Sequence, residues 1–424
     1  MKEDFLHYVW QYQLFDKSNL KCTDGSVLSV LKTGTHNTNS GPDFINARIS
    51  LNEILWAGQV EIHIKSSDWN SHKHNNDVAY DNVVLHVVWE ENQLIERTDK
   101  SMIPTLELKN IVSTDLVSQY KGLVDNSENI ACRSFIGEAT ELNKISMLDN
   151  ALARRLNSKT EFIKERLAAT NFDWEEVAYQ ILGKNYGFKL NADAFLHLAE
   201  VLPLKILQKH RGNLFQIEAL CFGQAGFLEE IKEEYQTKLK EEYTFLAKKY
   251  GIESKKVNKQ EWRFLRTRPS NFPTLRIAQF ASLINSTPSI FSFFKDNVDP
   301  KFLSITLSNP PSEYWQEHYD FGKKSAKKNK GLGISSVYNV LINTGVNLLA
   351  AYSDATNNRI FFEQAVEVLE HLKPEDNHIT RKWADLGIEI NSAFDSQALI
   401  EQYNNYCCLK KCLSCSIGVA YLKN

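Results

Sequence analysis

The sequence predicts an α+β domain over residues 1–125, built from a mixed sheet with flanking helices, followed by a large all-α domain over 126–424. Short apolar runs separated by turn residues dominate the first part, as expected of strands. From Leu148 onward, apolar residues recur at helical spacing through Leu152 and Leu156. The length of 424 residues also exceeds one usual domain of about 150 residues. Two domains of different class are therefore expected.

The first domain begins with a short helix, because Phe5 and Val9 fall near one face. Strands are then expected over 26–32, 46–51, 55–64, 83–89 and 102–108. The run 83–89 is almost continuously apolar, which is typical of a strand covered on both faces. Pro104 places the last run at a sheet edge or a strand start, since proline cannot donate to a ladder.

Composition narrows the class of protein. A hydrophobic fraction of 43% and a net charge of −3 fit a globular protein and exclude a uniformly cationic nucleic-acid coat. No apolar run approaches the roughly 20 residues of a membrane span, so no membrane association is expected. The acidic first residues do not resemble a secretory signal. With seven cysteines, an odd number, the chain is expected in the reducing cytoplasm.

An acidic pair stands out in the first domain, in Gly41-Pro42-Asp43-Phe44 and Val60-Glu61-Ile62-His63. Glu61 and His63 are two apart on an expected strand, so their side chains share one face. Together with Asp43 they could bind a hard ion such as Mg²⁺ or Mn²⁺, which activates water and stabilises charge on a phosphate. The alternative is that Glu61 and His63 merely face solvent.

Asp43 after a proline, Glu61 eighteen positions on, and a basic residue two further along resemble the PD-(D/E)XK nuclease superfamily. The resemblance covers about the first 110 residues and implies a nuclease-like core of helix, three antiparallel strands, helix and strand. It also implies that Asp43 and Glu61 hold the metal. The usual lysine position holds His63 instead, and Lys65 on the same face is the substitute. This departure leaves open a non-catalytic protein that binds nucleic acid or protein on a degenerate nuclease fold.

The loop after the Glu61 strand is rich in possible metal ligands. His72 and His74 have the spacing H-x-H, which would place both imidazoles on one side of an extended chain. Asp77 follows three residues later and adds a carboxylate. A metal-binding protein with unrelated hydrolytic chemistry is therefore a third hypothesis. His86, within an apolar run, is expected to be a buried, hydrogen-bonded histidine.

Four of the seven cysteines lie close together near the end of the sequence, as Cys407, Cys408, Cys412 and Cys415. Cys412 and Cys415 form a C-x₂-C pair, the spacing that lets two thiolates bind one metal ion. Cys132 is the expected remote ligand, since it lies near the start of the helical domain. These residues predict Zn²⁺ or an iron–sulfur cluster, and the alternative is four small buried side chains on a helix.

An arginine-rich stretch in the helical domain interleaves four arginines with three aromatic residues: Arg263, Arg266, Arg268 and Arg276, with Trp262, Phe264 and Phe272. Arginine makes bidentate contacts to phosphate, and aromatic rings stack on bases. The stretch is the best candidate in this sequence for contact with a nucleic-acid partner. The competing interpretation is a structural turn whose arginines pair with glutamates of neighbouring helices.

Several motifs taken together resemble an uncharacterised bacterial family known as a domain of unknown function: Gly-Pro-Asp-Phe, Val-Glu-Ile-His, Leu85-His86-Val87-Val88, Phe222-Gly223-Gln224-Ala225-Gly226, Arg266-Thr267-Arg268-Pro269 and the terminal cysteines. This resemblance covers nearly the whole chain and implies no activity. The leading hypothesis from the residues is therefore a metal-dependent enzyme that hydrolyses phosphodiester bonds.

Overall fold

The computed structural model describes residues 1–297 and 299–423 and divides into two compact units. One unit contains Met1–Met147 together with the chain from Gln402 onward, and the other contains Leu148–Glu401. We call them the sheet unit and the helical unit. The expected mixed sheet with helices, followed by a mostly helical region, is confirmed at this level.

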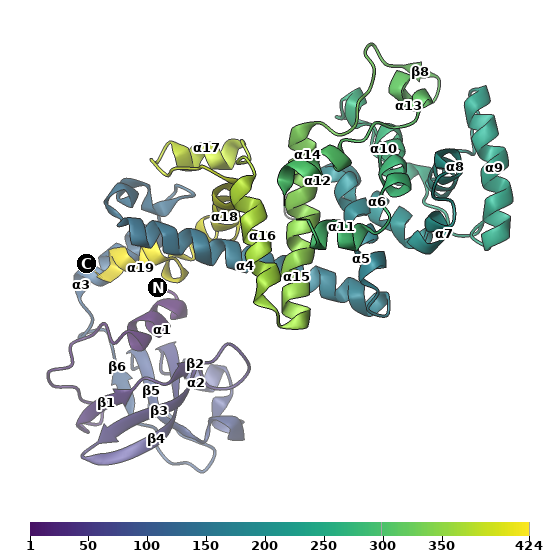
Figure 1. Cartoon of the computed structure of the whole chain (residues 1–424). Coiled ribbons are helices and arrows are strands. Elements are labelled where there is room, and N and C mark those ends of the chain that lie inside the picture. The colour runs from purple at the N-terminus through teal and green to yellow at the C-terminus, as the bar shows by residue number, and fades with distance from the viewer. Residues whose placement is uncertain (298, 424) are drawn as a thin grey trace. The chain divides into compact units, whose positions relative to one another are not determined.

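The sheet unit is built on one curled mixed sheet, drawn in purple in Figure 1. Its strands follow the spatial order β1-β3-β4-β5-β6, and the short β2 also pairs with β3. The strand bounds are β1 (Leu28–Lys32), β2 (Thr35–His36), β3 (Phe44–Leu51), β4 (Ile54–Lys65), β5 (Val83–Glu90) and β6 (Thr105–Glu107). Strands β1, β3 and β4 are antiparallel, whereas β4, β5 and β6 are parallel. Pro104 directly precedes the edge strand β6, as its missing donor requires.

Local sequence explains the main turns of this sheet. Asn52 and Glu53 both have positive φ and connect β3 to β4 in a two-residue hairpin, the geometry that matches strand twist. Gly58 lies where β4 passes closest to β5, and a Cβ there would approach Val84 Cγ1 to 2.4 Å. Any larger residue at position 58 would push β4 and β5 apart.

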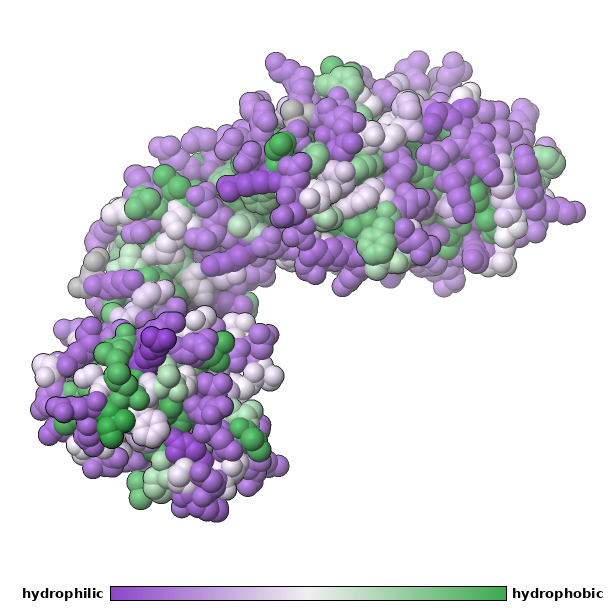
Figure 2. Space-filling view, turned by 60° about the horizontal axis from the view of Figure 1, so that its bottom comes forward, coloured by the Kyte–Doolittle hydropathy of each residue, from purple (hydrophilic) through white to green (hydrophobic). Residues whose placement is uncertain are grey.

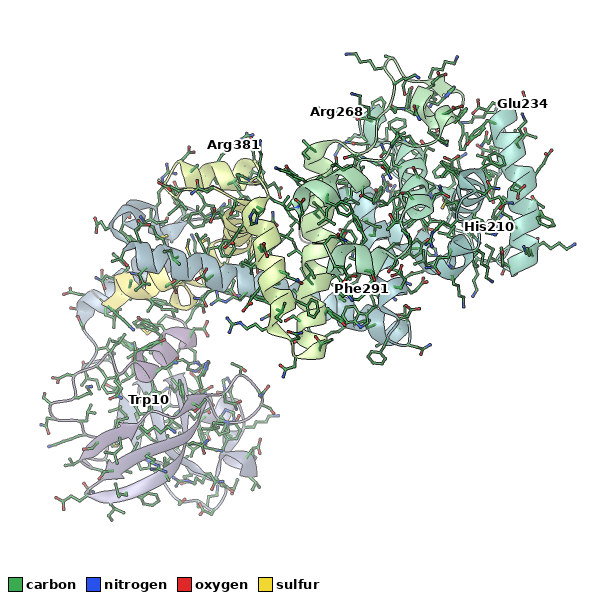
Figure 3. The ribbon with its side chains drawn as sticks, viewed as in Figure 1. Trp10, His210, Glu234, Arg268, Phe291 and Arg381 are labelled. Atoms are coloured by element: carbon green, nitrogen blue, oxygen red, sulfur yellow. The ribbon has the colours of Figure 1, made fainter. Side chains whose placement is uncertain are left out.

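Short helices surround the sheet, namely α1 (Glu3–Gln11), α2 (Asp68–Ser71), α3 (Thr114–Val124) and α19 (Ser416–Lys423). Helix α1 directs Phe5, Val9 and Trp10 into the core. Trp10, labelled in Figure 3, is fully buried, and its indole N–H donates to the carbonyl of Thr33. This packing fixes α1 against the sheet.

The end of the chain belongs to the sheet unit, which differs from the expected boundary between 125 and 126. Leu422 of α19 is buried in the same apolar core as the sheet. Tyr421 stacks on Phe135 at 3.8 Å, and the Tyr8 hydroxyl donates to the Val419 carbonyl. The change to helical spacing of apolar residues predicts where the helices begin. It cannot show that a helix from the last part of the sequence packs in the core formed by the first part.

The helical unit contains α5 (Trp174–Tyr186), α6 (Phe188–Val201), α7 (Leu204–Gln208), α8 (Leu214–Gln224), α9 (Glu234–Tyr250), α10 (Pro273–Ser286), α11 (Ile290–Lys295), α12 (Pro300–Leu307), α13 (Glu313–Glu317), α14 (Ile334–Val340), α15 (Asn347–Thr356), α16 (Arg359–His371), α17 (His378–Ala384) and α18 (Ala393–Gln402). Helix α4 (Glu141–Ala169) precedes them, and a small pair of strands, β7 (His318–Asp320) and β8 (Lys323–Lys324), interrupts them. One continuous apolar core joins these helices. Hydrophilic residues predominate on the face that Figure 2 shows, and apolar residues appear there in small groups.

One helical stretch in this unit, Ile334–Thr356, is long and apolar enough to cross a membrane by length and composition. Its most apolar window is 67% buried within the structure. A core helix of a globular unit passes the same test, because burial in protein and burial in lipid select the same side chains.

Candidate metal centre

The parallel pairing of β4 with β5 places the predicted acidic strand in the interior of the sheet unit. Glu61 and His63 are 5% and 1% exposed, so the solvent-facing alternative does not describe them. Glu61 pairs in register with His86 of β5. The alternate residues Val60 and Ile62 are also fully buried, on the other face of β4. A carboxylate and an imidazole are therefore held together at a site from which water is largely excluded.

Asp43 lies directly before β3 and is tied to the Glu61 strand by two reciprocal hydrogen bonds. The backbone N–H of Asp43 donates to Glu61 Oε2 at 3.1 Å, and the N–H of Ile62 donates to Asp43 Oδ2 at 2.9 Å. The last pair of β3 with β4 is Phe44 with Val60, so Asp43 and Ile62 lie just beyond the ladder and their groups are available for these bonds. These two backbone N–H groups thus hold Asp43 and Glu61, the acidic pair predicted from the sequence, next to each other.

Three histidines meet Glu61 at this point. His63 Nε2 lies 3.1 Å from His72 Nδ1 and 3.6 Å from Glu61 Oε1, while His74 Nε2 lies 3.3 Å from Glu61 Oε1. Ligand atoms of the three histidines all lie within 4.8 Å of one another. A tetrahedral ion with bonds of about 2.0–2.1 Å separates its ligand atoms by about 3.3 Å. We call Glu61, His63, His72 and His74 the His–Glu cluster.

The H-x-H pair reaches the cluster by a turn, because the segment is not extended as the sequence suggested. Helix α2 ends at Ser71, and Lys73 has φ 66°, in the left-handed region. His74 then opens a short 3₁₀ turn. This turn directs both imidazoles toward His63, with ring centroids 5.0 and 5.4 Å away. Tyr80 stacks on His74 at 3.8 Å and holds its ring in place.

Burial controls the charge of His63. Desolvation, with repulsion from His72 and His74, lowers the pKa of His63 to about 4, so the ring is neutral at pH 7 and offers a lone pair. His63 Nδ1 lies 2.8 Å from His86 Nε2. If Nε2 of His63 binds an ion, its proton lies on Nδ1 and is donated to His86. His86 is fully buried, as expected, and is also the partner that orients a possible ligand.

Glu61 carries the negative charge of the cluster. Burial raises the pKa of Glu61, the hydrogen bond from His74 opposes this rise, and the nearby charge of Asp43 adds to it. Nε2 of His74 is buried and lies 3.3 Å from Glu61 Oε1. An imidazole nitrogen and a carboxylate oxygen are both groups that bind divalent metal ions.

Two residues of α1 complete this region and were missed in the sequence. His7 Nε2 lies 3.3 Å from Asp43 Oδ2. Burial lowers the pKa of His7, but the hydrogen bond and charge of Asp43 outweigh it and leave the pKa raised. Glu3, one helical turn earlier, has its pKa raised by burial and then by the charge of Asp43. The spacing of Glu3 and His7, four apart on one helix face, was the available signal.

Lys65 and Asp77 lie outside the cluster. The Lys65 side chain is exposed, and its backbone N–H donates to Asp68 Oδ2. Asp77 is exposed, and its carboxylate accepts from the backbone N–H of Ala79 to cap a short 3₁₀ turn. The catalytic role expected of Lys65 and the ligand role expected of Asp77 are not supported by these positions.

The arginine-rich stretch lies in the helical unit, where Arg268 is labelled in Figure 3. A pocket of about 380 Å³ is lined by Arg266, Arg268 and Arg276, with Lys189 and Phe188. Arg263 does not line it, and its side chain is exposed. Within residues 1–297 and 299–423, none of these four arginines forms an ion pair with a carboxylate. The expected alternative, arginines paired with glutamates, does not describe the stretch.

Arg276 is the unusual member of this pocket. It is 5% exposed, donates to Gln279 and Asn271, and lies 4.7 Å from the Phe188 ring centroid. Its Nε is buried and has no hydrogen-bond partner among the described residues. Burial lowers the pKa of Arg276 to about 10. A buried cation without a carboxylate partner is costly, and an anion in the pocket would offset that cost.

The cysteines of the sheet unit also come together. Cys132, Cys407, Cys412 and Cys415 line one small cavity, whereas Cys408 is exposed. Cys132 lies in a 3₁₀ turn (Ala131–Ser134) that follows α3. The alternative of four neighbouring cysteines on one helix does not hold, because Cys407 ends a π-helical segment (Tyr403–Cys407), whereas Cys412 begins a separate 3₁₀ turn (Cys412–Ser414) that Cys415 follows.

Comparison with known proteins places the chain in one family. No curated protein and no solved structure matches it. A single family model, described as a protein of unknown function, matches residues 3–378. The matched span includes Asp43, the His–Glu cluster and the arginine-rich stretch, and it agrees with the resemblance that the sequence motifs indicated. The chain therefore belongs to the family described as Protein of unknown function (DUF2851).

Proposed function

We propose that the sheet unit is a metal-dependent hydrolase of phosphodiester bonds in nucleic acid. The observation that carries this proposal is the His–Glu cluster, in which the three histidine ligand atoms lie within 4.8 Å of one another and Glu61 Oε1 lies 3.6 Å from His63 and 3.3 Å from His74, next to Asp43 and His7. A structural ion pair would need one histidine beside Glu61, whereas this site gathers three. Buried imidazoles of depressed basicity are expensive to assemble, and metal binding offsets their cost.

The donor set favours a transition metal. Imidazole suits Zn²⁺, Fe²⁺ or Mn²⁺ better than Mg²⁺, which prefers oxygen ligands. The expected Mg²⁺ or Mn²⁺ at Asp43 and Glu61 is thereby refined toward an ion held by Glu61, His63, His72 and His74. Such an ion lowers the pKa of water and stabilises negative charge on phosphate.

Residues in and around the cluster have separate roles in the proposed reaction. Glu61 partly neutralises the ion, and His86 fixes the proton of His63 on the nitrogen away from it. Asp43 Oδ2 lies 3.3 Å from His7 Nε2, and the hydrogen bond and charge of Asp43 leave the pKa of His7 raised, which favours its protonated form. His7 with Asp43 is therefore our candidate for the group that moves a proton, the role first expected of His63 or Lys65.

The choice of a nucleic-acid substrate is supported by the order of elements. Helix α1, the antiparallel strands β1, β3 and β4, a helical crossover and the parallel strand β5 follow the order that the PD-(D/E)XK resemblance implies. Asp43 and Glu61 occupy the corresponding carboxylate positions on adjacent strands. A metal-dependent hydrolase of other esters is the alternative that uses the same cluster.

A second candidate function rests on the arginine pocket. Three arginines and Lys189 without a carboxylate partner form a cationic site in the helical unit. We propose that this pocket binds backbone phosphate of nucleic acid. This role would persist if the sheet unit were a non-catalytic binding module on a degenerate nuclease fold. Hydrolysis by the sheet unit and phosphate binding by the arginine pocket must therefore be tested separately.

The catalytic proposal is tested with the protein loaded with Mn²⁺, Zn²⁺ or Fe²⁺ and with labelled DNA and RNA. Glu61→Gln removes the anionic ligand and should reduce cleavage about 100-fold or more. Glu96→Gln, an exposed glutamate of the same unit, is the matched control. Equal cleavage by the two variants would refute catalysis at this cluster. Cleavage of a simple phosphate ester without cleavage of nucleic acid would support the alternative, a metal-dependent hydrolase of other esters.

The binding proposal is tested with Arg266→Glu/Arg268→Glu and with short single-stranded DNA. Lys248→Glu/Lys249→Glu on exposed positions of α9 makes the same change of net charge. We expect at least about a tenfold loss of affinity and a shallower salt dependence in the arginine variant only, because phosphate contacts release counterions. Equal losses of affinity in the two variants would show that only net charge matters and would refute specific binding in this pocket.

A further inference from the structure

The cysteine cavity joins two parts of the sequence that are far apart. Its volume is about 20 Å³, and its lining includes Cys132, Cys407, Cys412 and Cys415. Cys132 comes just after α3, whereas the other three lie at the end of the chain, after the whole helical unit. All four belong to the sheet unit, and none forms a disulfide. Local sequence does not explain why four cysteines from remote segments line one cavity.

The backbone around the late cysteines is shaped to direct them inward. Lys410 has φ 55°, a left-handed conformation that returns the chain between Cys407 and Cys412. The N–H of Cys415 donates to the Cys412 carbonyl, which closes the C-x₂-C turn. Gly418 lies so close to this turn that a Cβ would come within 2.3 Å of the Cys412 carbonyl oxygen. Helix α19 therefore holds the turn in place.

The surroundings of the cavity are suited to sulfur ligands. Cys407 and Cys415 are each 9% exposed, and Cys408, next to Cys407, is exposed instead. Gln402 Nε2 lies 3.9 Å from Cys407 Sγ, in position to donate to the sulfur. Lys411 lines the cavity and supplies positive charge near the thiolates that a metal would create. Hydrogen bonds and charge of this kind stabilise bound thiolates.

We propose that Cys132, Cys407, Cys412 and Cys415 form a four-cysteine metal centre, separate from the His–Glu cluster. Each thiol loses its proton when its sulfur binds, so the centre would release protons as it forms. The four residues supply the complete ligand set of a structural site, which leaves no position open for a substrate. Cys408 is excluded from the centre by its exposure.

The spacing favours an iron–sulfur cluster over a single zinc ion. Cys407, Cys412 and Cys415 have the spacing C-x₄-C-x₂-C of plant-type iron–sulfur proteins, although the remote cysteine, Cys132, precedes the motif here and follows it in those proteins. The cluster would also attach the end of the chain to the sheet unit.

The test uses the full-length protein purified without chelator under anaerobic conditions. Iron, sulfide and zinc are measured per chain, together with the visible absorption spectrum. X-ray absorption at the metal edge then counts the sulfur neighbours. We expect a brown protein with one cluster and four protein sulfur ligands. One zinc ion with four sulfur neighbours would support the centre and identify its metal as zinc. Metal-free wild-type protein that also takes up no iron and sulfide on reconstitution would overturn the proposal.

Variants locate the centre. Cys132→Ser should lose most of the bound metal, although it lies far in sequence from Cys412. Cys408→Ser is the matched control in the same turn and should keep it. Glu61→Gln should also keep this metal, which separates the centre from the proposed hydrolase. Full metal content in Cys132→Ser, or equal loss in both cysteine variants, would refute the assigned ligand set independently of protein stability.

Discussion

The sheet unit contains two groups of metal-competent side chains that are built in opposite ways. In the His–Glu cluster, Glu61 and His63 lie on a central strand and His72 and His74 follow within the next crossover. In the cysteine centre, Cys132 must meet residues that come after the entire helical unit. The first group lies on one strand of the sheet and the crossover that follows it. The second group forms only when the segment from Gln402 onward packs against the segment that contains Cys132.

This difference predicts that the two groups of side chains have different roles. Strand β4 is held by apolar neighbours on both sides, so the sheet should persist without an ion in the His–Glu cluster. The late turns around Cys412 have few buried apolar residues of their own. Their order should depend much more on what the sulfurs bind. We therefore expect the histidines to govern activity and the cysteines to govern folding.

The largest expected effect tests this separation directly. Cys132→Ser should lower the melting temperature of the sheet unit by about 10 °C, because losing a structural metal removes several kcal/mol of stability. His72→Ala should change it by only a few degrees, since His72 is exposed. Calorimetry of both variants measures the two shifts. Similar shifts would show that the two groups do not divide the roles in this way.

A second, smaller effect concerns pH. Desolvation lowers the pKa of His63 to about 4 and holds the pKa of His86 well below its usual 6.5. The unfolded chain therefore binds these protons first as pH falls, so His63 alone should cost the metal-free protein about 3 kcal/mol of stability between pH 6.5 and pH 4, and His86 should add to this loss. Urea unfolding with chelator at several pH values measures this loss.

The control for the pH effect lies in the same unit. His63→Leu should reduce the dependence on pH by the contribution of His63, because it removes one of the two histidines that titrate and leaves His86. Burial raises the pKa of Cys132 to about 12 and that of Cys412 to about 11, so the cysteines do not titrate in this window. An unchanged slope in His63→Leu would show that other groups cause the acid sensitivity.

A third effect tests the partner that orients His63. His86→Leu leaves every proposed ligand in place but removes the acceptor for His63 Nδ1. We expect a 10- to 100-fold loss of metal affinity, the usual consequence of removing such a partner. Competition with a fluorescent chelator measures the affinity, and the cysteine-bound metal should be unaffected. Unchanged affinity would reduce His86 to a packing residue.

The smallest expected effect is that of Asp77→Asn, in the cap of a short turn. Its carboxylate accepts one backbone hydrogen bond and is exposed, so the loss of stability should stay below about 1 kcal/mol. Metal affinity should not change. A clear loss of affinity would return Asp77 to the ligand set that the sequence first suggested.

The sequence was most informative where the ligands are close along the chain. The alternation around Val60–Glu61–Ile62–His63 predicted a strand that carries both groups on one face, and that strand is β4. It could not predict that this face would be buried, or that parallel pairing with β5 would bring His86 beside Glu61 from a separate segment. The H-x-H spacing pointed to His72 and His74, but the left-handed Lys73 between them depends on the packing of Trp69 and Tyr80.

Long-range partners were harder to predict. Cys132 was expected as a ligand because it lies just after the join between the two predicted domains, and in the structure it lines one cavity with the late cysteines. His7 was missed, because nothing in α1 shows that its face turns toward Asp43. The arginines were found as a stretch, but the sequence could not show which of them share a pocket. Only the fold shows that Arg276 is buried there and that Arg263 is not.

The return of the late segment to the sheet unit has a consequence for synthesis. A ribosome releases Cys132 and the whole sheet long before it makes Cys407, Cys412 and Cys415. During that interval the sheet unit lacks α19, and the buried position of Leu422 in its core is open. A chain released before residue 407 would keep its histidines and lack Cys407, Cys412 and Cys415. The sheet unit can therefore complete its core only after the ribosome has made the chain through Leu422.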